Sequence, residues 1–345
     1  MGKLKIGIDL HNRASVFMPE QGLDYDLNRL VDLAVLCEEL GFDCVSVGDS
    51  LLAKPRWRAI PTMAAIAART RRIKVMSHIL MPHYFNNPVL LAQELATLDE
   101  ISQGRLILGC GIGAGKTALV EQEHRLCGVP KARRGKVFEE TIHLLKKLWT
   151  EEEVTFRGEF YNLEGVRLGL RPRQRPHPPI WIAAGLFFTG QRGSGPFGDD
   201  EPAQEHRRGF IAPVDRVARL GDGWLTNQCT AEEFKANLEQ IRELARKHGR
   251  DPSTITTAYN RGVFVDADVK RGFEEVKWFE YSYHAMPVPD ETIHRWTIFG
   301  TGPECVRQIE PFVQAGVETF IICVRARDMF AQVRALAREV LPAFR

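Results

Sequence analysis

The sequence predicts a single (β/α)8 barrel that spans residues 1–345. Short apolar segments alternate with amphipathic helical segments along the chain, and eight such pairs can be counted. This alternation indicates a parallel sheet with right-handed crossovers, and eight units favour a closed barrel over an open doubly wound sheet, which is the alternative. The length of 345 residues also suits one barrel domain.

Strands are expected where a short apolar run precedes a polar loop, and helices where apolar residues recur at helical spacing. The expected strands are residues 4–10, 43–47, 73–81, 105–110, 179–184, 223–226, 255–265 and 317–324. The expected helices are residues 26–40, 57–70, 88–101, 136–149, 214–220, 231–248, 270–280, 303–315 and 329–341. Gly41 follows the first helix, where glycine tolerates a left-handed C-terminal cap.

Two insertions interrupt the repeat, after the fourth and the fifth strand. The first, residues 151–178, contains a segment at 154–163 that is typical of a small β-hairpin. The second, residues 186–211, is rich in glycine, proline and charge and has no helix or strand pattern. A long segment of this kind after a barrel strand is either a lid over the active site or a solvated excursion.

The composition favours a small-molecule partner over nucleic acid or membrane. The formal net charge is only +2, from 46 basic and 44 acidic residues, and no apolar stretch is long enough to span a membrane. Seven cysteines occur singly, as expected for reduced thiols in the cytoplasm. The histidines and cysteines show no spacing typical of metal ligands, so no metal is expected.

The string GCGIGAGKT, residues 109–117, follows the fourth strand. It fails as a phosphate-binding P-loop because Cys110 stands where that motif needs glycine. Gly109, Gly111 and Ala114 match the dinucleotide fingerprint, but that motif belongs in a first βα unit, and this is the fourth. The alternatives are a glycine-rich backbone that a flat ring or phosphate approaches closely, or a turn that needs positive φ angles.

Polar side chains follow several strands at the end of the barrel where such enzymes carry their chemistry. Asp49 ends the second strand, and it is either a catalytic carboxylate or a cap for the next helix. His11 follows the first strand, and His78 and His83 lie in and after the third; each is either a proton donor or acceptor or a structural residue.

The fifth strand ends in three small residues, Ala183, Ala184 and Gly185. Small residues let backbone N–H groups face an anion, as in the phosphate sites of many barrels, although packing against a helix is the alternative. No Gly-x-Ser-x-Gly motif is present, so covalent hydrolysis is not supported.

Several strings together resemble the luciferase-like monooxygenase superfamily. They are FDCVSVGDS, NPVLLAQELATLDEISQGRLILGCGIG, RRGKVFEETIHLLKKLWTEEEVTFRGEFYNL, PPIWIAAG, RLGDGWLT and FGTGPECVRQIEPFVQAGVETFIICV, and they cover nearly the whole chain. The N-terminal form, KIGIDL followed by ELGFDCVSVGD, is more similar to the branch that depends on coenzyme F420. The resemblance implies a (β/α)8 barrel, usually a homodimer, that binds F420 or, alternatively, reduced FMN.

The resemblance also implies site residues. Asp49 matches the family's aspartate after strand two, and Gly109, Gly111 and Gly113 match its cofactor loop. Residues 183–185 match the turn on the phosphate side of the cofactor. A non-prolyl cis peptide is implied in strand three, at Ile79–Leu80 within SHILMP, and the resemblance implies that this bulge backs the cofactor ring, with His78 among the cofactor-binding residues.

One position departs from the family pattern. Many F420-dependent members have Asp-His after strand two, and here Ser50 replaces the histidine at a position that borders the cofactor. The usual proton-transfer residue is therefore missing, and His11, His83 or Tyr84 could substitute, or the reaction needs no protein base. Asp49, His11 and His83 are thus the candidate catalytic residues.

The leading hypothesis is hydride transfer between F420 and a small organic substrate, with the cofactor carrying the chemistry. A flavin or F420 reductase would then be a natural partner. One rival is a two-component monooxygenase that uses reduced FMN and oxygen. The other is a catalytically inactive subunit that only binds cofactor, which the serine at position 50 favours.

Overall fold

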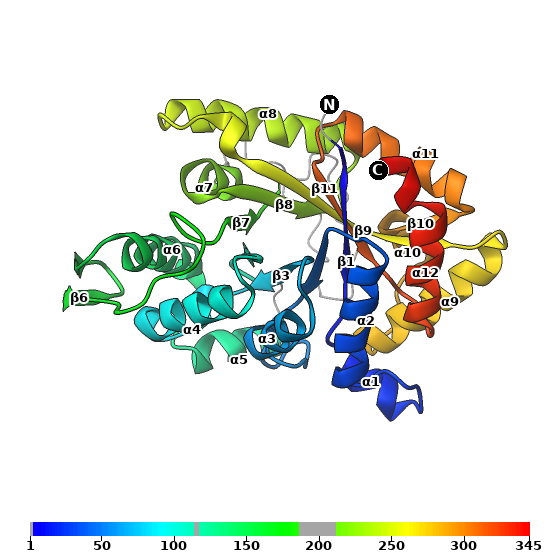
Figure 1. Ribbon diagram of the computed structural model, residues 1–345, viewed down its shortest axis with the longest axis horizontal. Helices are drawn as coiled ribbons and strands as arrows, with labels where there is room; N and C mark the ends of the chain where they lie inside the picture. Colours follow the sequence, from blue (N-terminus) through cyan, green and yellow to red (C-terminus); the bar gives the residue numbers. More distant parts are fainter. Residues whose placement is uncertain (1–2, 114–116, 186–211) are drawn as a thin grey trace.

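The computed structural model, which describes residues 3–113, 117–185 and 212–345, has a closed barrel of parallel strands at its centre (Figure 1). The order around the barrel is β1-β2-β3-β4-β7-β8-β9-β11, and pairing between β11 and β1 closes it. The strands are β1 (Lys5–Asp9), β2 (Cys44–Val47), β3 (Lys74–Leu80), β4 (Leu106–Cys110), β7 (Ile180–Ala183), β8 (Gly223–Asn227), β9 (Thr256–Val265) and β11 (Thr319–Cys323). The predicted (β/α)8 barrel is confirmed.

Helices surround the barrel on the outside (Figure 1). They are α1 (Ala14–Glu20), α2 (Leu27–Glu39), α3 (Ala59–Arg69), α4 (Pro88–Ile101), α5 (Ala118–Leu126), α6 (Arg134–Thr150), α7 (Ala212–Leu220), α8 (Ala231–Lys247), α9 (Val269–His284), α10 (Asp290–Trp296), α11 (Gly302–Gln314) and α12 (Met329–Glu339). Amphipathic spacing explains their docking: α2, capped by the Asp26 carboxylate, buries Leu30, Leu33 and Cys37 on one face.

Three helices and one strand were not predicted from the sequence: α1, α5, α10 and a ninth strand of the barrel sheet, β10 (Thr297–Gly300). Helices α1 and α10 have seven residues each, too few for a periodic apolar stripe. Strand β10 pairs with the second half of β9, from Gly262 to Val265, because β9 is ten residues long and extends beyond its barrel partners. The sequence gives no cue for such an added edge strand.

Six apolar side chains fill the inside of the barrel below its mouth. They come from β3, β4, β7, β8, β9 and β11 and are Met76, Ile107, Trp181, Leu225, Ala258 and Ile321. Ile79 and Ala183 pack on top of this cluster. The barrel is therefore filled rather than hollow, and open space remains only above these side chains.

The first insertion forms the expected hairpin, from β5 (Val154–Arg157) and β6 (Asn162–Val166), which pair antiparallel. The Glu140 carboxylate on α6 holds its turn by accepting hydrogen bonds from the backbone N–H groups of Phe160 (3.0 Å) and Tyr161 (2.7 Å). The second insertion, which we expected to be a lid or a solvated excursion, lies outside the described residues.

No described helix is long and apolar enough to cross a membrane.

Candidate active site

A cavity of about 620 Å³ opens at the C-terminal ends of the barrel strands. Its lining includes Asp9 at the end of β1, Ile79 in β3, Gly111 after β4, Ala183 at the end of β7 and Cys323 at the end of β11. This is the end of a (β/α)8 barrel where active sites are found. The cavity is large enough for a cofactor ring and a small substrate together.

Ten of the residues singled out in the sequence line this cavity. They are His11, Asp49, Ser50, His78, Ile79, Gly111, Gly113, Ala183, Ala184 and Gly185. They come from five separate βα units, which the closure of the barrel brings together.

Three of the predicted site residues do not line the cavity. Leu80 is fully buried in the core between the strands and the helices. Gly109 faces the neighbouring strand, because a Cβ there would lie 2.1 Å from the Ser77 carbonyl oxygen. Leu80 thus packs in the core and Gly109 packs against β3, so neither residue faces the cavity.

His83 is the third. It lies in a short 3-10 helix after β3, is 1% exposed, and packs edge-on against Tyr84 and Phe138. Burial lowers the pKa of His83 to about 3, so the ring is neutral at physiological pH. The structure therefore places this candidate catalytic histidine in the protein interior, outside the cavity.

The cis peptide lies one residue earlier than expected, at His78–Ile79 instead of Ile79–Leu80. Pairing of β3 with β4 is regular up to His78 opposite Gly109, and it then skips to Leu80 opposite Cys110. Ile79 is thus the bulged residue, and the cis bond leads into it. The bulge turns the Ile79 side chain into the cavity, beside Gly111.

Asp49 links the end of β2 to the start of helix α3. Its carboxylate forms an ion pair with Arg58 (3.2 Å) and accepts a hydrogen bond from the N–H of Ala59, the first residue of α3. Burial raises the pKa of Asp49, although Arg58 and the Ala59 N–H act in the opposite direction. This geometry matches the alternative that Asp49 caps the next helix.

Ser50 is bound to helix α5. Its hydroxyl donates to Glu123 Oε1 (3.0 Å), and the same oxygen accepts hydrogen bonds from the N–H groups of Leu51 and Ala53, at 2.8 and 2.9 Å, and of Leu52. The buried Glu123 carboxylate thus organises the loop between β2 and α3. Serine at this position therefore supports the loop.

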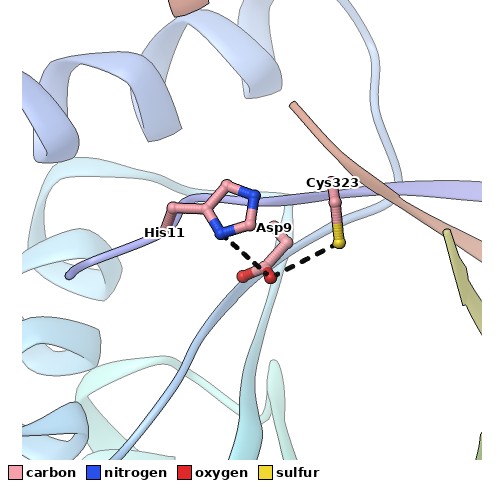
Figure 2. A group of neighbouring side chains, drawn as sticks. All are labelled: Asp9, His11 and Cys323. Atoms are coloured by element: carbon pink, nitrogen blue, oxygen red, sulfur yellow. Dashed lines mark hydrogen bonds and ion pairs between the residues drawn. The ribbon is translucent and has the colours of Figure 1, made fainter. Parts of the chain in front are cut away.

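The floor of the cavity carries a compact polar group (Figure 2). Asp9 Oδ2 lies 3.6 Å from His11 Nδ1, 3.7 Å from His78 Nδ1 and 3.8 Å from Cys323 Sγ. Burial disfavours its charge, but His11, His78 and Arg56 hold the pKa of Asp9 well below its usual value. Burial in turn lowers the pKa of His11 to about 4, so Asp9 is ionised and His11 neutral at pH 7.

One wall of the cavity is formed by α9 and the segment after β11. Glu280 is 2% exposed and binds Arg325 Nε (2.6 Å) and His284 Nε2 (3.0 Å). Burial opposes its ionisation, yet Arg325 and His284 lower the pKa of Glu280 below its usual value. The buried charge of Arg325 is therefore balanced within the wall.

A second group of cations faces the cavity from the loop after β2. Arg56 donates to the Tyr283 hydroxyl (2.9 Å), and Lys54 lies beside the same ring. Burial, followed by the charges of Arg56 and Arg13, lowers the pKa of Lys54 to about 7. An amine with such a pKa can accept or release a proton near neutrality.

Sequence reasoning missed these functional candidates for two reasons. Asp9, Cys323 and Arg325 end or follow strands, so the rule that barrel chemistry lies at strand ends could have found them. Glu280 and His284 lie on a helix, and nothing in the sequence tells which side of α9 faces the cavity.

The chain is similar to known proteins over most of its length. The family model of the luciferase-like monooxygenases matches residues 5–186 and 211–319. F420-dependent glucose-6-phosphate dehydrogenase of Amycolatopsis mediterranei is 27% identical over 329 residues, covering 92% of this chain and 94% of that protein. The enzyme of the same name from Nocardia farcinica is 27% identical, covering 100% and 99%.

Solved structures share the fold over the whole chain. An F420-dependent secondary alcohol dehydrogenase, in complex with an F420-acetone adduct, superposes with a TM-score of 0.78 at 21% identity and covers 100% of both chains. The monooxygenase RslO1 from Streptomyces bottropensis superposes with a TM-score of 0.79 at 22% identity, covering 99% of this chain and 100% of its own.

Proposed function

Because the chain belongs to the luciferase-like monooxygenase family, we propose that it is an oxidoreductase that binds coenzyme F420 in the barrel mouth and transfers hydride between F420 and a small organic substrate. The F420-dependent dehydrogenases among its relatives, which align over nearly the full chain, support this choice of cofactor.

The observation that carries the proposal is a cradle of small residues beside the bulge in β3. A Cβ on Gly111 would lie 2.4 Å from Ile79 Cδ1 and 3.4 Å from Ala183 Cβ, so the absence of a side chain at position 111 keeps this side of the cavity open. Gly113, Ala184 and residue 185 continue the surface. A flat ring system fits against an apolar, side-chain-poor surface of this kind.

The protein's own contribution is orientation and proton handling. Bound F420 would supply hydride acceptance or donation. Ile79 would press against one face of the ring, and the small side chains of the Ala183–Gly185 turn would leave room for the anionic tail. Lys54, on the cavity surface with a pKa of about 7, would take the proton that a substrate hydroxyl loses.

Fluorescence titration of the purified chain with F420 and with FMN tests the proposal. We expect saturable F420 binding and at least about tenfold weaker FMN binding. Gly111→Val should weaken F420 binding by about tenfold or more, because the new side chain occupies the cradle. The matched control is Gly169→Ala, since a Cβ there meets nothing within 4 Å.

Tight FMN binding without F420 binding would contradict the proposal and favour an FMN-dependent monooxygenase. Binding of neither cofactor would favour a subunit without redox activity. An F420 affinity that Gly111→Val leaves unchanged would place the cofactor outside this cavity.

We further propose a homodimer that works in the cytoplasm and shares its cofactor with a flavin or F420 reductase. Seven free cysteines, six of them buried, support a reducing compartment. Sedimentation equilibrium at a mass of twice 39.1 kDa is the expected result for the dimer.

A further inference from the structure

The cavity floor brings together two side chains from the start of the chain and one from near its end. Asp9 ends β1, His11 follows two residues later, and Cys323 ends β11, which pairs with β1. Each offers one ligand atom, and these atoms all lie within 4.8 Å of one another. Figure 2 shows the imidazole and the thiol on either side of the carboxylate.

We propose that Asp9, His11 and Cys323 form a zinc site whose fourth position opens into the cavity. Carboxylate oxygen, imidazole nitrogen and cysteine sulfur are the ligands that Zn²⁺ takes in proteins. Three protein ligands with one open position is the arrangement of catalytic zinc sites, and all three residues line the cavity.

The distances suit a tetrahedral ion. Bonds of about 2.0–2.3 Å to zinc place neighbouring tetrahedral ligands about 3.3–3.6 Å apart. Asp9 Oδ2 already lies 3.6 Å from His11 Nδ1 and 3.8 Å from Cys323 Sγ. The ligand atoms of His11 and Cys323 lie within 4.8 Å of each other. Side-chain rotations that move these atoms by about 1 Å bring them to the required separation.

A second layer of side chains already orients the ligands. Ser46 Oγ donates to Asp9 Oδ1 (3.3 Å), which leaves Oδ2 to face the other two ligands. Asn260 Nδ2 donates to Cys323 Sγ (2.9 Å) and to the carbonyl of Ile321 (3.2 Å). Hydrogen bonds to the far carboxylate oxygen and to the sulfur are the usual support of a metal site.

His11 supplies the strongest sign of a ligand. It is a non-glycine residue with a left-handed backbone, φ +46°, and its ring is 8% exposed. Its Nε2 has no hydrogen-bond partner among the described residues, while its Nδ1 faces Asp9 Oδ2 at 3.6 Å. A left-handed backbone at a non-glycine residue and an unpartnered buried nitrogen are both costly, and they persist here beside a carboxylate and a thiol that can bind an ion.

The local charges permit a cation. Cys323 releases its thiol proton to solvent when it binds the ion, so its thiolate and the Asp9 carboxylate offset the charge of the ion, and the nearby Arg325 is paired with Glu280 at 2.6 Å. The open position is suited to the oxygen of a substrate hydroxyl or carbonyl group. This substrate class rests on the proposed function, whereas the metal site itself does not.

Titration of the chelator-treated protein with Co²⁺, followed by displacement with Zn²⁺, tests the site. We expect one Co²⁺ per chain, with visible bands of a tetrahedral ion and a near-ultraviolet thiolate-to-cobalt band that Zn²⁺ abolishes. Cys323→Ser should remove the thiolate band and weaken binding at least tenfold, and Asn260→Ala should weaken it about 10–100-fold. Cys127→Ser, outside the cavity, is the matched control and should change neither.

Asp9→Asn and His11→Gln provide independent variants if Cys323→Ser does not fold. The proposal is overturned if the parent protein binds no stoichiometric Co²⁺, or if the thiolate band survives Cys323→Ser. F420 titration on the same samples separates the two hypotheses: cofactor binding without a cobalt spectrum refutes only the metal site, and a cobalt spectrum without cofactor binding refutes only the proposed function.

Discussion

At position 50, the serine hydroxyl donates its hydrogen bond to Glu123 and so fastens a loop. We therefore assign Ser50 no part in proton transfer. The neighbouring Asp49 forms an ion pair with Arg58 and accepts a hydrogen bond from the first residue of α3. Lys54, which the same loop presents to the cavity, is the cationic group with a pKa near neutrality. In the proposed function the proton acceptor is therefore Lys54, four residues after Ser50.

Lys54→Met should lower the rate of substrate oxidation by about 10²–10⁴-fold, the usual contribution of a general base. In the parent protein the rate should rise with pH through about 7, because Lys54 accepts a proton only when its amine is neutral. The assay follows reduction of F420 from pH 5.5 to 9. A variant that keeps the rise through pH 7 would assign the base to another residue.

His83→Phe should protect the fold against acid. Burial lowers the pKa of His83 from 6.5 to about 3, so between these values the unfolded chain binds the proton that the folded chain excludes. Stability therefore falls as the pH drops below 6.5, by about 1.4 kcal/mol per unit from this residue.

Relative to the parent, His83→Phe should gain about 2 kcal/mol in the free energy of unfolding between pH 7 and pH 5. Urea unfolding followed by circular dichroism at both pH values measures it. The exposed His143→Gln variant should follow the parent. An equal loss of stability in all three proteins would show that His83 is protonated in the folded state.

At the scale of elements, α5 and the loop after β2 act as one unit. Glu123 on α5 accepts hydrogen bonds from the Ser50 hydroxyl and from three consecutive backbone N–H groups of residues 51–53. Hydrogen bonds to a buried charged group contribute about 1.5–3 kcal/mol each. The helix therefore sets the position of the cavity wall that carries Lys54 and Arg56.

Glu123→Ala should free this loop without unfolding the barrel. We expect hydrogen exchange of the amides of residues 51–53 to accelerate about tenfold or more, and F420 binding to weaken. Glu121→Ala is the matched control, since Glu121 lies on the same helix and pairs with Lys131 at the surface. Unchanged exchange in the loop after Glu123→Ala would contradict this role.

At the scale of the whole molecule, periodicity was enough to predict all eight barrel strands. Apolar runs of four to ten residues mark strands that are buried on both faces, and their ends agree with the structure within one or two residues. Strand β10 and the short helices α1 and α10 could not be predicted, because their place depends on tertiary partners and not on a pattern of their own.

The site was predictable only in part, for a similar reason. Strand ends locate the cavity, so residues such as His11, Gly111 and Ala183 could be expected there. Alternation within a strand decides which side chain points inward, and a bulge shifts that alternation: Ile79 enters the cavity while Leu80 joins the core. The group of Asp9, His11 and Cys323 depends on closure between β1 and β11, which residue spacing does not show.

A crystal structure of the chain with F420 bound tests the central claim most directly. We expect the deazaflavin ring between the Ile79 bulge and Gly111, its phosphate tail beside residues 183–185, and its hydride-carrying carbon toward the floor of Asp9, His11 and Cys323. F420 bound elsewhere on the molecule, or a ring turned away from this floor, would contradict it.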